Sequence, residues 1–384
     1  MSVDIEIDAM TDFSLRLIAS FGRHFFRHDL FYFNPKGIAM FVRNSWYVIG
    51  GSDEVTTTPL ARKILGDSVV IYRNLSGRPV ALEDRCPHRH LPLSMGTVQG
   101  DEIRCGYHGM KFDASGECVE VPNQDNIPNK ACVRAYPVEE RFGWIWIWTG
   151  DKDEADVSLI PDFSVMSRPD RKSVGKTNYV KANYQLVTDN LMDLSHVAFV
   201  HTTTIGNNEM GEKGSMRLTP TEAGVRVVRH INDVPPPPTY LRTKQLPIGK
   251  NIDRWNVIEF MAPCFIIIHV GGKVAGCGAL DGDYEGGLNM WVCNAMTPET
   301  ETSTHYFWAS VREFALDSTE VDDLLFSNVS EAFEEDRVVL ETQQRVIAEC
   351  GDSWSSALKA DAGCLQARRV VDRLLREERH KTEQ

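Results

Sequence analysis

The pattern of apolar and polar positions divides the chain into a β-rich first part and a second part that mixes strands with long helices. Between residues 41 and 150, short apolar runs alternate with turns rich in glycine, serine and aspartate, which is typical of short strands. In the run 143–150, tryptophan and isoleucine alternate strictly, so the two residue types point to opposite faces of a strand. Such an aromatic stripe belongs more often to a core than to a cofactor platform. The expected strands are 46–49, 68–73, 78–84 and 143–150, with a hairpin over 111–119 that turns at 113–116.

The acidic stretch 151–156 is interpreted as a linker to a second domain. Beyond it, the pattern predicts strands, then a helix that carries histidines, and from residue 317 onward a helical periodicity. The last predicted helix, 365–378, is amphipathic. We therefore expect an N-terminal extension over 1–40, one domain over 41–150 and another over 151–384. The further expected strands are 255–260, 264–270, 287–293 and 303–310, and the prolines at 235–238 favour an extended surface segment near a pocket mouth.

The composition narrows the range of partners. A formal net charge of −13 over 384 residues argues against a nucleic-acid partner, whose phosphates need a basic face. An anionic substrate would have to be held by a local arginine, histidine or amide. No apolar run approaches the ~20 residues of a membrane span, so no membrane partner is expected. Nine cysteines, an odd and scattered set, indicate reduced thiols in the cytoplasm. Residues 1–40 lack the basic start of a signal peptide and are interpreted as an amphipathic helix or a flexible extension.

Two short loops in the first domain combine ligand types that suit an iron–sulfur centre. The first contains Cys86 and His88, and the second contains Cys105 and His108. Two thiolates and two imidazoles are what a Rieske [2Fe–2S] cluster needs, with the thiolates on one iron and the imidazoles on the other. Structural zinc also accepts two cysteines and two histidines, but the interleaved order here differs from zinc-finger spacings. The sequence therefore favours a Rieske cluster over zinc.

A second constellation lies in the stretch 189–201. Asn190, Asp193 and His196 are each three residues apart, so on a helix they share one face. His201 follows His196 by five residues, which on an ideal helix is roughly 140° away from that face. If both histidines bind one metal, the helix must end or deform between them. The threonines that follow His201 favour an ending, since β-branched residues are poor helix formers.

Two histidines need a third ligand to make a mononuclear iron site. Two neutral imidazoles and one carboxylate leave positions on iron open for substrate-directed oxygen chemistry. The candidates are Glu334, Glu335 and Asp336. Composition alone does not choose among them, and acidic residues at the start of a helix often only complement its dipole.

The two constellations, in this order, resemble Rieske non-haem iron oxygenases, above all those of the vanillate O-demethylase type, with dicamba O-demethylase and toluenesulfonate methyl-monooxygenase as relatives. The resemblance covers nearly all of 41–378 and leaves out residues 1–40. One departure is His90, where the family usually has glycine. The matching stretches are FVRNSWYV, CPHRHLPLSMG, CGYHGMKFDASG, ERFGWIWIWTGD, IPDF, DNLMDLSHVAFVHTTTIG, TPETETSTHYFWASVREF, EEDRVVLETQQ and DAGCLQARRVVDRLL.

The resemblance implies an α+β architecture, in which an all-β Rieske [2Fe–2S] domain precedes a catalytic domain with an antiparallel sheet of the helix-grip type. It implies that Asp336 completes the mononuclear Fe(II) site and that Asn190 lies close to this iron. Asp193 matches a carboxylate that joins a cluster histidine of one subunit to an iron-ligand histidine of the next, which implies a homotrimer. The implied ligands are Cys86, Cys105, His88 and His108 for the cluster and His196, His201 and Asp336 for the mononuclear iron.

The implied activity is that of a terminal oxygenase, which O-demethylates a methoxylated aromatic acid with O₂ and releases a phenol and formaldehyde. The chain lacks a dinucleotide-binding glycine motif and a plant-type ferredoxin motif, so its electrons must come from a separate NAD(P)H-dependent reductase of the flavin/ferredoxin type. Two alternatives stay open. A ring-hydroxylating or aryl-ether-cleaving dioxygenase would share every metal ligand, and an electron carrier would lack the second iron.

The substrate pocket is less well defined by the sequence. An aromatic carboxylate needs an arginine or another polar clamp together with apolar or aromatic walls. Five residues on the predicted strands of the catalytic domain are candidates, and the sequence does not choose among them. They are Arg254, Asn256, His269, Asn294 and His305.

Overall fold

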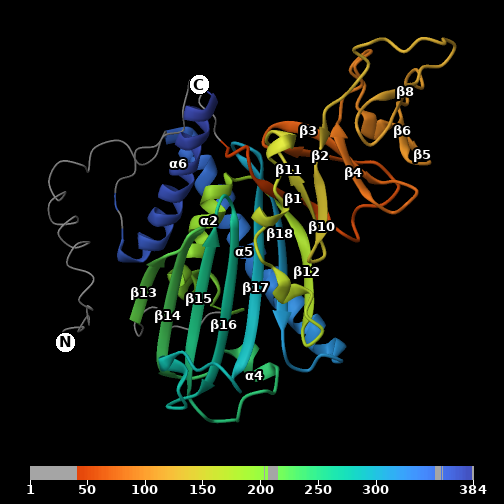
Figure 1. Ribbon diagram of the computed structural model, residues 1–384. Coiled ribbons are helices and arrows are strands. Elements are labelled where there is room, and N and C mark those ends of the chain that lie inside the picture. Colours follow the sequence, from red (N-terminus) through yellow and green to blue (C-terminus); the bar gives the residue numbers. More distant parts are fainter. Residues whose placement is uncertain (1–40, 203, 206–214, 351–355, 357, 383–384) are drawn as a thin grey trace.

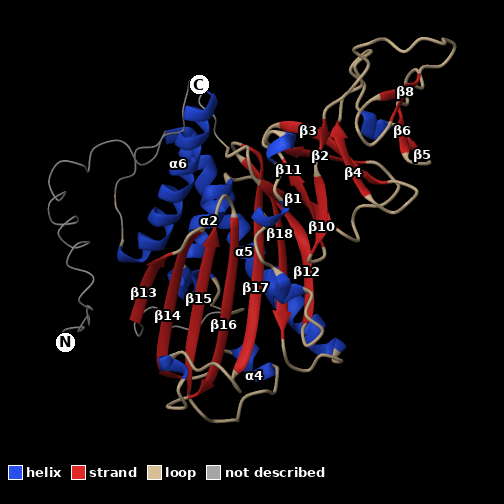
Figure 2. Ribbon diagram, viewed as in Figure 1, coloured by secondary structure: helices blue, strands red, loops and turns tan. Residues whose placement is uncertain are grey.

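Four antiparallel sheets form the framework of the protein, as the computed structural model shows (Figure 1). The structure describes residues 41–202, 204–205, 215–350, 356 and 358–382. The helix or extension expected over 1–40 lies outside these residues. In the first part of the chain, short strands are connected by loops. In the second part, helices pack against one large sheet (Figure 2). This arrangement agrees with the expected α+β class.

Three of the sheets belong to the N-terminal part. One has the order β1-β11-β10, a second β2-β3-β4-β9, and a third β5-β6-β7-β8. The third sheet and the loops around it project from one corner of the molecule and share a small core with β3 and β4 (Figure 1). The strands are β1 (Trp46–Gly51), β2 (Leu60–Ile64), β3 (Asp67–Arg73), β4 (Pro79–Glu83), β5 (Thr97–Gln99), β6 (Glu102–Arg104), β7 (Lys111–Phe112), β8 (Cys118–Glu120), β9 (Ala135–Tyr136), β10 (Val138–Arg141) and β11 (Trp144–Trp148).

The alternating stripe of tryptophans on β11 is part of the core, as expected. All five residues of the strand are buried. Trp146 contacts Phe163 and Phe265, with ring centroids 5.9 and 5.3 Å apart, so the strand joins the N-terminal part to the large C-terminal sheet. Thr297 adds a polar link between the two parts, because its hydroxyl donates to the carbonyl of Val48 at 2.8 Å.

A seven-stranded sheet with the order β12-β18-β17-β16-β15-β14-β13 dominates the C-terminal part. The expected strands in this region are confirmed. Strands β13 and β14 were not expected, because β13 is an edge strand with mostly exposed side chains and therefore has no apolar alternation. The strands are β12 (Lys172–Val180), β13 (Ser215–Pro220), β14 (Gly224–Val234), β15 (Ile252–Met261), β16 (Phe265–Val274), β17 (Leu288–Thr300) and β18 (Ser303–Arg312).

Three helices cover one face of this sheet: α2 (Tyr184–Met192), α5 (Thr319–Cys350) and α6 (Ala362–Thr382) (Figure 2). Helix α5 contacts β12 and β18, α2 contacts β16 and β17, and α6 contacts β14. The acidic residues 334–336 lie in the middle of the 32-residue helix α5 and not at its start, so complementarity to the helix dipole does not account for them.

The proline segment is extended up to Pro237, and Pro238 begins the short helix α4 (Pro238–Arg242). Proline suits the first turn of a helix because its missing N–H would have no partner there. Thr239 and Tyr240 of this helix line the cavity described below. The expected position near a pocket is therefore correct, although the last proline is helical.

Candidate metal centres and substrate cavity

The two cysteine–histidine loops meet at the tip of the small third sheet. Cys86 follows β4 and Cys105 follows β6, and both thiols are only 3% exposed. His88 and His108 are exposed, and their ring centroids lie 4.5 Å apart. Burial and the neighbouring Cys105 raise the pKa of the Cys86 thiol, so ionisation of this thiol needs a cation beside it. Buried thiols behind two exposed imidazoles fit a Rieske cluster, whose histidine-bound iron is the outer one.

The same geometry argues against a single zinc ion. Zinc draws four ligands to about 2.0–2.3 Å, so the ligand atoms would lie within ~4 Å of one another. Among the described residues, the one group of three or more potential ligands that converges within 4.8 Å lies elsewhere, in the second domain. The two cysteines and two histidines are spread more widely, as a cluster of two irons requires.

Glycines and one aspartate hold the two loops together. The carboxylate of Asp84 accepts hydrogen bonds from the amide and the hydroxyl of Ser94, both at 2.7 Å, which fixes the first loop. A Cβ on Gly96 would lie 2.1 Å from the carbonyl oxygen of Arg104, and one on Gly106 would lie 2.7 Å from that of Met95. These two glycines therefore allow the backbones of the two loops to pack directly against each other.

His90 occupies a backbone conformation that suits glycine. It has φ = 60° and its amide donates to the carbonyl of Cys86 at 2.9 Å, closing a tight turn. The left-handed region costs an L-residue roughly 1–2 kcal/mol, so glycine would fit this position with less strain. We expect His90→Gly to stabilise the cluster-bearing domain by about 1 kcal/mol, measured by thermal unfolding of the cluster-loaded protein. His90→Ala keeps a Cβ and is the control; an equal gain in both variants would contradict the explanation from strain.

The segment that carries the two histidines is broken twice. Helix α2 ends at Met192. Asp193 follows in an extended conformation, with φ and ψ of −117° and 93°, and then come the 3₁₀ turn η5 (Leu194–His196) and the short helix α3 (Val197–Val200). The expectation that Asn190, Asp193 and His196 share one face of a continuous helix is therefore wrong. The expected ending before His201 is confirmed.

The first break has a local cause. The Asp193 carboxylate accepts from the amide of Ser195 at 2.8 Å and from its hydroxyl at 3.0 Å, so it caps the start of a new turn. The carbonyl oxygen of Asp193 accepts from Nδ1 of His196 at 2.6 Å. The link to His196 thus runs through the backbone and not through the carboxylate, which differs from the expected carboxylate bonded to two imidazoles. The carboxylate itself stays partly exposed.

The structure brings His196, His201 and Asp336 together from distant parts of the chain. Their ligand atoms lie within 4.8 Å of one another. Oδ1 of Asp336 is 3.1 Å from Nε2 of His201 and 3.5 Å from Nε2 of His196, and Asn190 donates to the same oxygen at 3.0 Å. His201 and Asp336 are 1% and 6% exposed. Two imidazoles and one buried carboxylate are the donor set of a non-haem iron site, so these residues fit such an iron.

The geometry separates the three acidic candidates on α5. Glu334 is exposed and paired with Arg337. Glu335 accepts from Nδ1 of His201 at 2.7 Å and from the Thr204 hydroxyl at 3.0 Å. Asp336 alone faces both imidazole Nε2 atoms.

The pKa of His201 reflects these neighbours. Burial lowers this pKa, but the contacts with Asp336 and Glu335 outweigh burial and raise it above its ordinary value, so the surroundings of the imidazole favour positive charge.

Glu335, one of the three acidic ligand candidates, instead contacts the far nitrogen of His201, a role that the sequence does not reveal. A carboxylate can only accept hydrogen bonds, so its bond fixes the proton of His201 on Nδ1 and leaves Nε2 free to bind a metal.

We expect Glu335→Leu to weaken iron binding by roughly 10- to 100-fold without loss of the cluster. A chelator competition titration measures the iron affinity, and cluster absorbance serves as the internal check. Glu334→Leu on the same helix is the matched control, and an equal loss of affinity there would refute the positioning role of Glu335.

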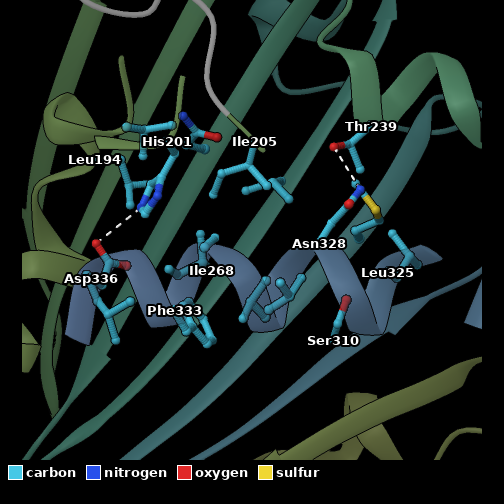
Figure 3. A pocket seen from close by; sticks show the side chains of 18 of the residues that line it. Leu194, His201, Ile205, Thr239, Ile268, Ser310, Leu325, Asn328, Phe333 and Asp336 are labelled. Carbon is cyan, nitrogen blue, oxygen red and sulfur yellow. Dashed lines mark hydrogen bonds and ion pairs between the residues drawn. The ribbon is translucent and has the colours of Figure 1, made fainter. Parts of the chain in front are cut away.

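A cavity of about 120 Å³ extends from the metal-binding triad along α5 (Figure 3). His201 and Leu194 lie opposite Asp336 at one end, and Thr239 lies opposite Asn328 at the other. Two alternate residues on each of three neighbouring strands face this cavity, as the alternation of strand side chains requires, and a fourth strand adds one residue. The strand residues that line it are Arg254 and Asn256 on β15, Ile268 and Val270 on β16, Met290 and Val292 on β17, and Ser310 on β18.

Two of the five pocket candidates line this cavity, namely Arg254 and Asn256. The other three do not. His269 stacks on Trp291 with ring centroids 4.7 Å apart, the Asn294 oxygen accepts from the Tyr306 hydroxyl at 2.8 Å, and Nε2 of His305 lies 3.2 Å from the carbonyl oxygen of Lys63. These three residues have structural contacts outside the cavity.

Comparison with known families agrees with this combination of sites. Residues 45–137 match the Rieske [2Fe-2S] domain, and residues 180–377 match the vanillate O-demethylase oxygenase C-terminal domain. A Rieske domain followed by a domain with two histidines and an aspartate defines the Rieske non-haem iron oxygenases, and this chain belongs to that family. Its cofactors are accordingly a [2Fe–2S] cluster and a mononuclear iron, and it is an oxidoreductase.

Several relatives and one solved structure resemble this chain over most of its length. The chain is 38% identical to a putative toluene-4-sulfonate monooxygenase system iron-sulfur subunit of Comamonas testosteroni, over 88% of this chain and 98% of the relative. It is 36% identical to a vanillate O-demethylase oxygenase subunit of a Pseudomonas species, over 88% and 95%. The crystal structure of dicamba monooxygenase bound to dicamba superimposes with a TM-score of 0.82 at 32% identity, over 88% and 99%. Both of the first two relatives are subunits of multicomponent systems.

No helix among the described residues combines the length and the apolar character needed to cross a membrane.

Proposed function

We propose that this chain is the terminal oxygenase of a multicomponent monooxygenase that O-demethylates a methoxylated aromatic acid resembling vanillate. In this reaction the aryl methyl ether, O₂, NAD(P)H and a proton give a phenol, formaldehyde, water and NAD(P)⁺. The observation that carries the proposal is the site of His196, His201 and Asp336 at one end of a cavity with largely apolar walls. A separate flavin- or ferredoxin-type reductase supplies the electrons.

The ligand assignments are part of the proposal. Cys86 and Cys105 hold one iron of the cluster, and His88 and His108 hold the other. His196, His201 and Asp336 hold the mononuclear iron. When bound, the two centres deliver electrons and activate O₂ beside the substrate methyl group.

The protein contributes positioning and exclusion of water. The Asp193 carbonyl and the Glu335 carboxylate hold the protons of His196 and His201 on Nδ1, so that both Nε2 atoms face Asp336. Asn190 donates to Asp336 and fixes the orientation of that carboxylate. Leu194, Phe333 and their apolar neighbours keep water from the methyl group and limit how the aromatic ring can enter.

Transfer of electrons between subunits of a homotrimer is the second part of the proposal. The cluster loops project from one corner of the molecule, whereas the iron site lies beside α5 (Figure 1). His88 and His108 are exposed, Asp193 is partly exposed, and Phe199, six residues after Asp193, is 79% exposed. These surfaces suit a contact in which Asp193 of one subunit meets a cluster histidine of the next. Light scattering on the purified protein tests the trimer.

A single-turnover assay tests the proposed reaction. The purified protein is reduced chemically, excess reductant is removed, and O₂ is added with each of several methoxybenzoates. Formaldehyde and a phenol, at nearly one per active site, would support demethylation. Oxidation of the cluster with no formaldehyde would point to ring hydroxylation or ether cleavage. An iron content no higher than that of the cluster would point to an electron carrier.

A cytoplasmic location is also proposed. None of the nine cysteines forms a disulfide with another, which suits a reducing compartment. Fractionation of the native host would test the location.

A further inference from the structure

We propose that Asn256 and Arg254, side by side on β15, bind the anionic oxygens of the substrate and make the cavity selective for arene carboxylates and sulfonates over their neutral analogues. This inference rests on the proposed demethylation, and it identifies the residues that hold the acid group during that reaction.

The side-chain amide of Asn256 is the first observation. Asn256 is 1% exposed and lines the cavity, and its Nδ2 has no hydrogen-bond partner among the described residues. A buried donor left unsatisfied costs about 1–3 kcal/mol, so its retention indicates an acceptor that arrives with a ligand. An unpartnered amide N–H₂ on a residue that lines a cavity suits an oxygen of a carboxylate or a sulfonate.

Arg254 is the second observation. It is two residues from Asn256 on the same face of β15, it is 3% exposed, and its guanidinium lies 5.1 Å from the ring centroid of Tyr240. It is the one lysine or arginine among the described residues that line the cavity. A guanidinium binds carboxylate and sulfonate oxygens through its planar set of donors. With a net charge of −13, the protein as a whole repels anions, so a local cation is needed to bind one.

The other side-chain amides along the cavity already have partners. Nδ2 of Asn328 donates to the hydroxyl of Thr239 at 3.2 Å, and that hydroxyl donates to the carbonyl of Thr204 at 3.0 Å. Asn190 donates to Asp336. The donor of Asn256 is therefore better placed to receive an acid group than these amides are.

The proposed iron ligands and the anion-binding pair lie on different walls of the cavity, and this separation fixes how the substrate is oriented. The metal-binding residues come from the η5–α3 segment and α5, whereas Asn256 and Arg254 come from the sheet wall. An aromatic ring held through its acid group at β15 can extend its methyl-bearing substituent toward His196, His201 and Asp336. The acid group then decides which substituent reaches the iron.

The test compares acids with neutral analogues of similar size. Binding of benzoate, toluene-4-sulfonate and benzamide to the metal-loaded protein is measured by calorimetry, together with kcat/KM for 4-methoxybenzoate and 4-methoxybenzamide. We expect the wild type to prefer the acids, and Asn256→Leu to reduce that preference by roughly 10- to 100-fold. Asn256→Asp, which places a negative charge beside the acid, should abolish it. Arg254→Gln should weaken acid binding and leave benzamide binding nearly unchanged.

Asn328→Leu is the matched control, because it makes the same substitution in the same cavity at an amide that already has a partner. It should change the affinities for acid and amide to a similar extent. Cluster absorbance and iron content confirm that each variant is folded and loaded. An acid preference that survives both Asn256 substitutions would overturn the inference.

The outcomes also separate this inference from the proposed reaction. Selective acid binding that is lost in the Asn256 variants supports the anion site even if no methoxybenzoate yields formaldehyde, in which case demethylation is the part that fails. Formaldehyde release by a wild type that binds acid and amide equally would support demethylation and overturn the anion site.

Discussion

Replacing Asp336 with alanine should remove the mononuclear iron and lower formaldehyde release by well over ~100-fold, since even the outer partners of metal ligands contribute about 10- to 100-fold. The carboxylate is 6% exposed and lies 3.1 and 3.5 Å from the two imidazole Nε2 atoms. No other carboxylate of the described chain faces both of these atoms. The loss should therefore be specific to this position on α5.

Iron analysis and visible absorbance check this expectation together. Asp336→Ala should keep the absorbance of the cluster and lose one iron per chain. Glu334→Ala removes a neighbouring carboxylate that is exposed and paired with Arg337, and it should retain both iron and turnover. Full iron content and normal turnover in Asp336→Ala would show that another group completes the site.

Replacing Asp193 with asparagine should leave both metal centres in place and reduce turnover by about 100-fold, because in the proposed homotrimer electrons would no longer pass efficiently between subunits. Asparagine is also a good capping residue, so its side-chain oxygen can still accept from the Ser195 amide. The backbone carbonyl that holds His196 is unchanged by the substitution. What is lost is the charge of the partly exposed carboxylate.

Stopped-flow absorbance provides the decisive measurement. With substrate and O₂, the reduced cluster of the wild type should be oxidised quickly, and that of Asp193→Asn slowly. Ser195→Ala removes the hydroxyl contact to the carboxylate but keeps its charge, so this variant should behave like the wild type. Rapid oxidation of the cluster in Asp193→Asn, with a full iron content, would refute the bridging role.

The features that the sequence predicted well depend on local patterns. Strand β11 alternates strictly, and the cysteine–histidine loops have an order and spacing that suit two irons, so both could be identified without tertiary information. The edge strand β13 could not, because a strand that exposes most of its side chains has no apolar period.

The features that were wrong or missed depend on contacts between distant segments. The helix breaks at Asp193 because the side chain of this residue caps the next turn. The three-residue spacing of Asn190, Asp193 and His196 had instead suggested a continuous helix. Glu335 contacts His201 only because of the way α5 is rotated about its axis. The two residues are 134 positions apart in the sequence. Likewise, the sequence alone could not show that Arg254 and Asn256 line the cavity and His269 does not. That distinction depends on the register of β15 and β16, which decides which side chains face the cavity.

The cavity has its metal-binding residues on helical segments and much of its wall on a sheet, and this division affects how the enzyme can diversify. Substitutions at alternate positions of β15 to β18 reshape the wall while the opposite face of each strand keeps its own packing. Selection can therefore change the accepted molecule without disturbing the residues proposed to bind iron. Relatives named for toluenesulfonate, vanillate and dicamba are 34–38% identical to this chain. A combinatorial library confined to these alternate strand positions is accordingly an efficient way to retarget the oxygenase.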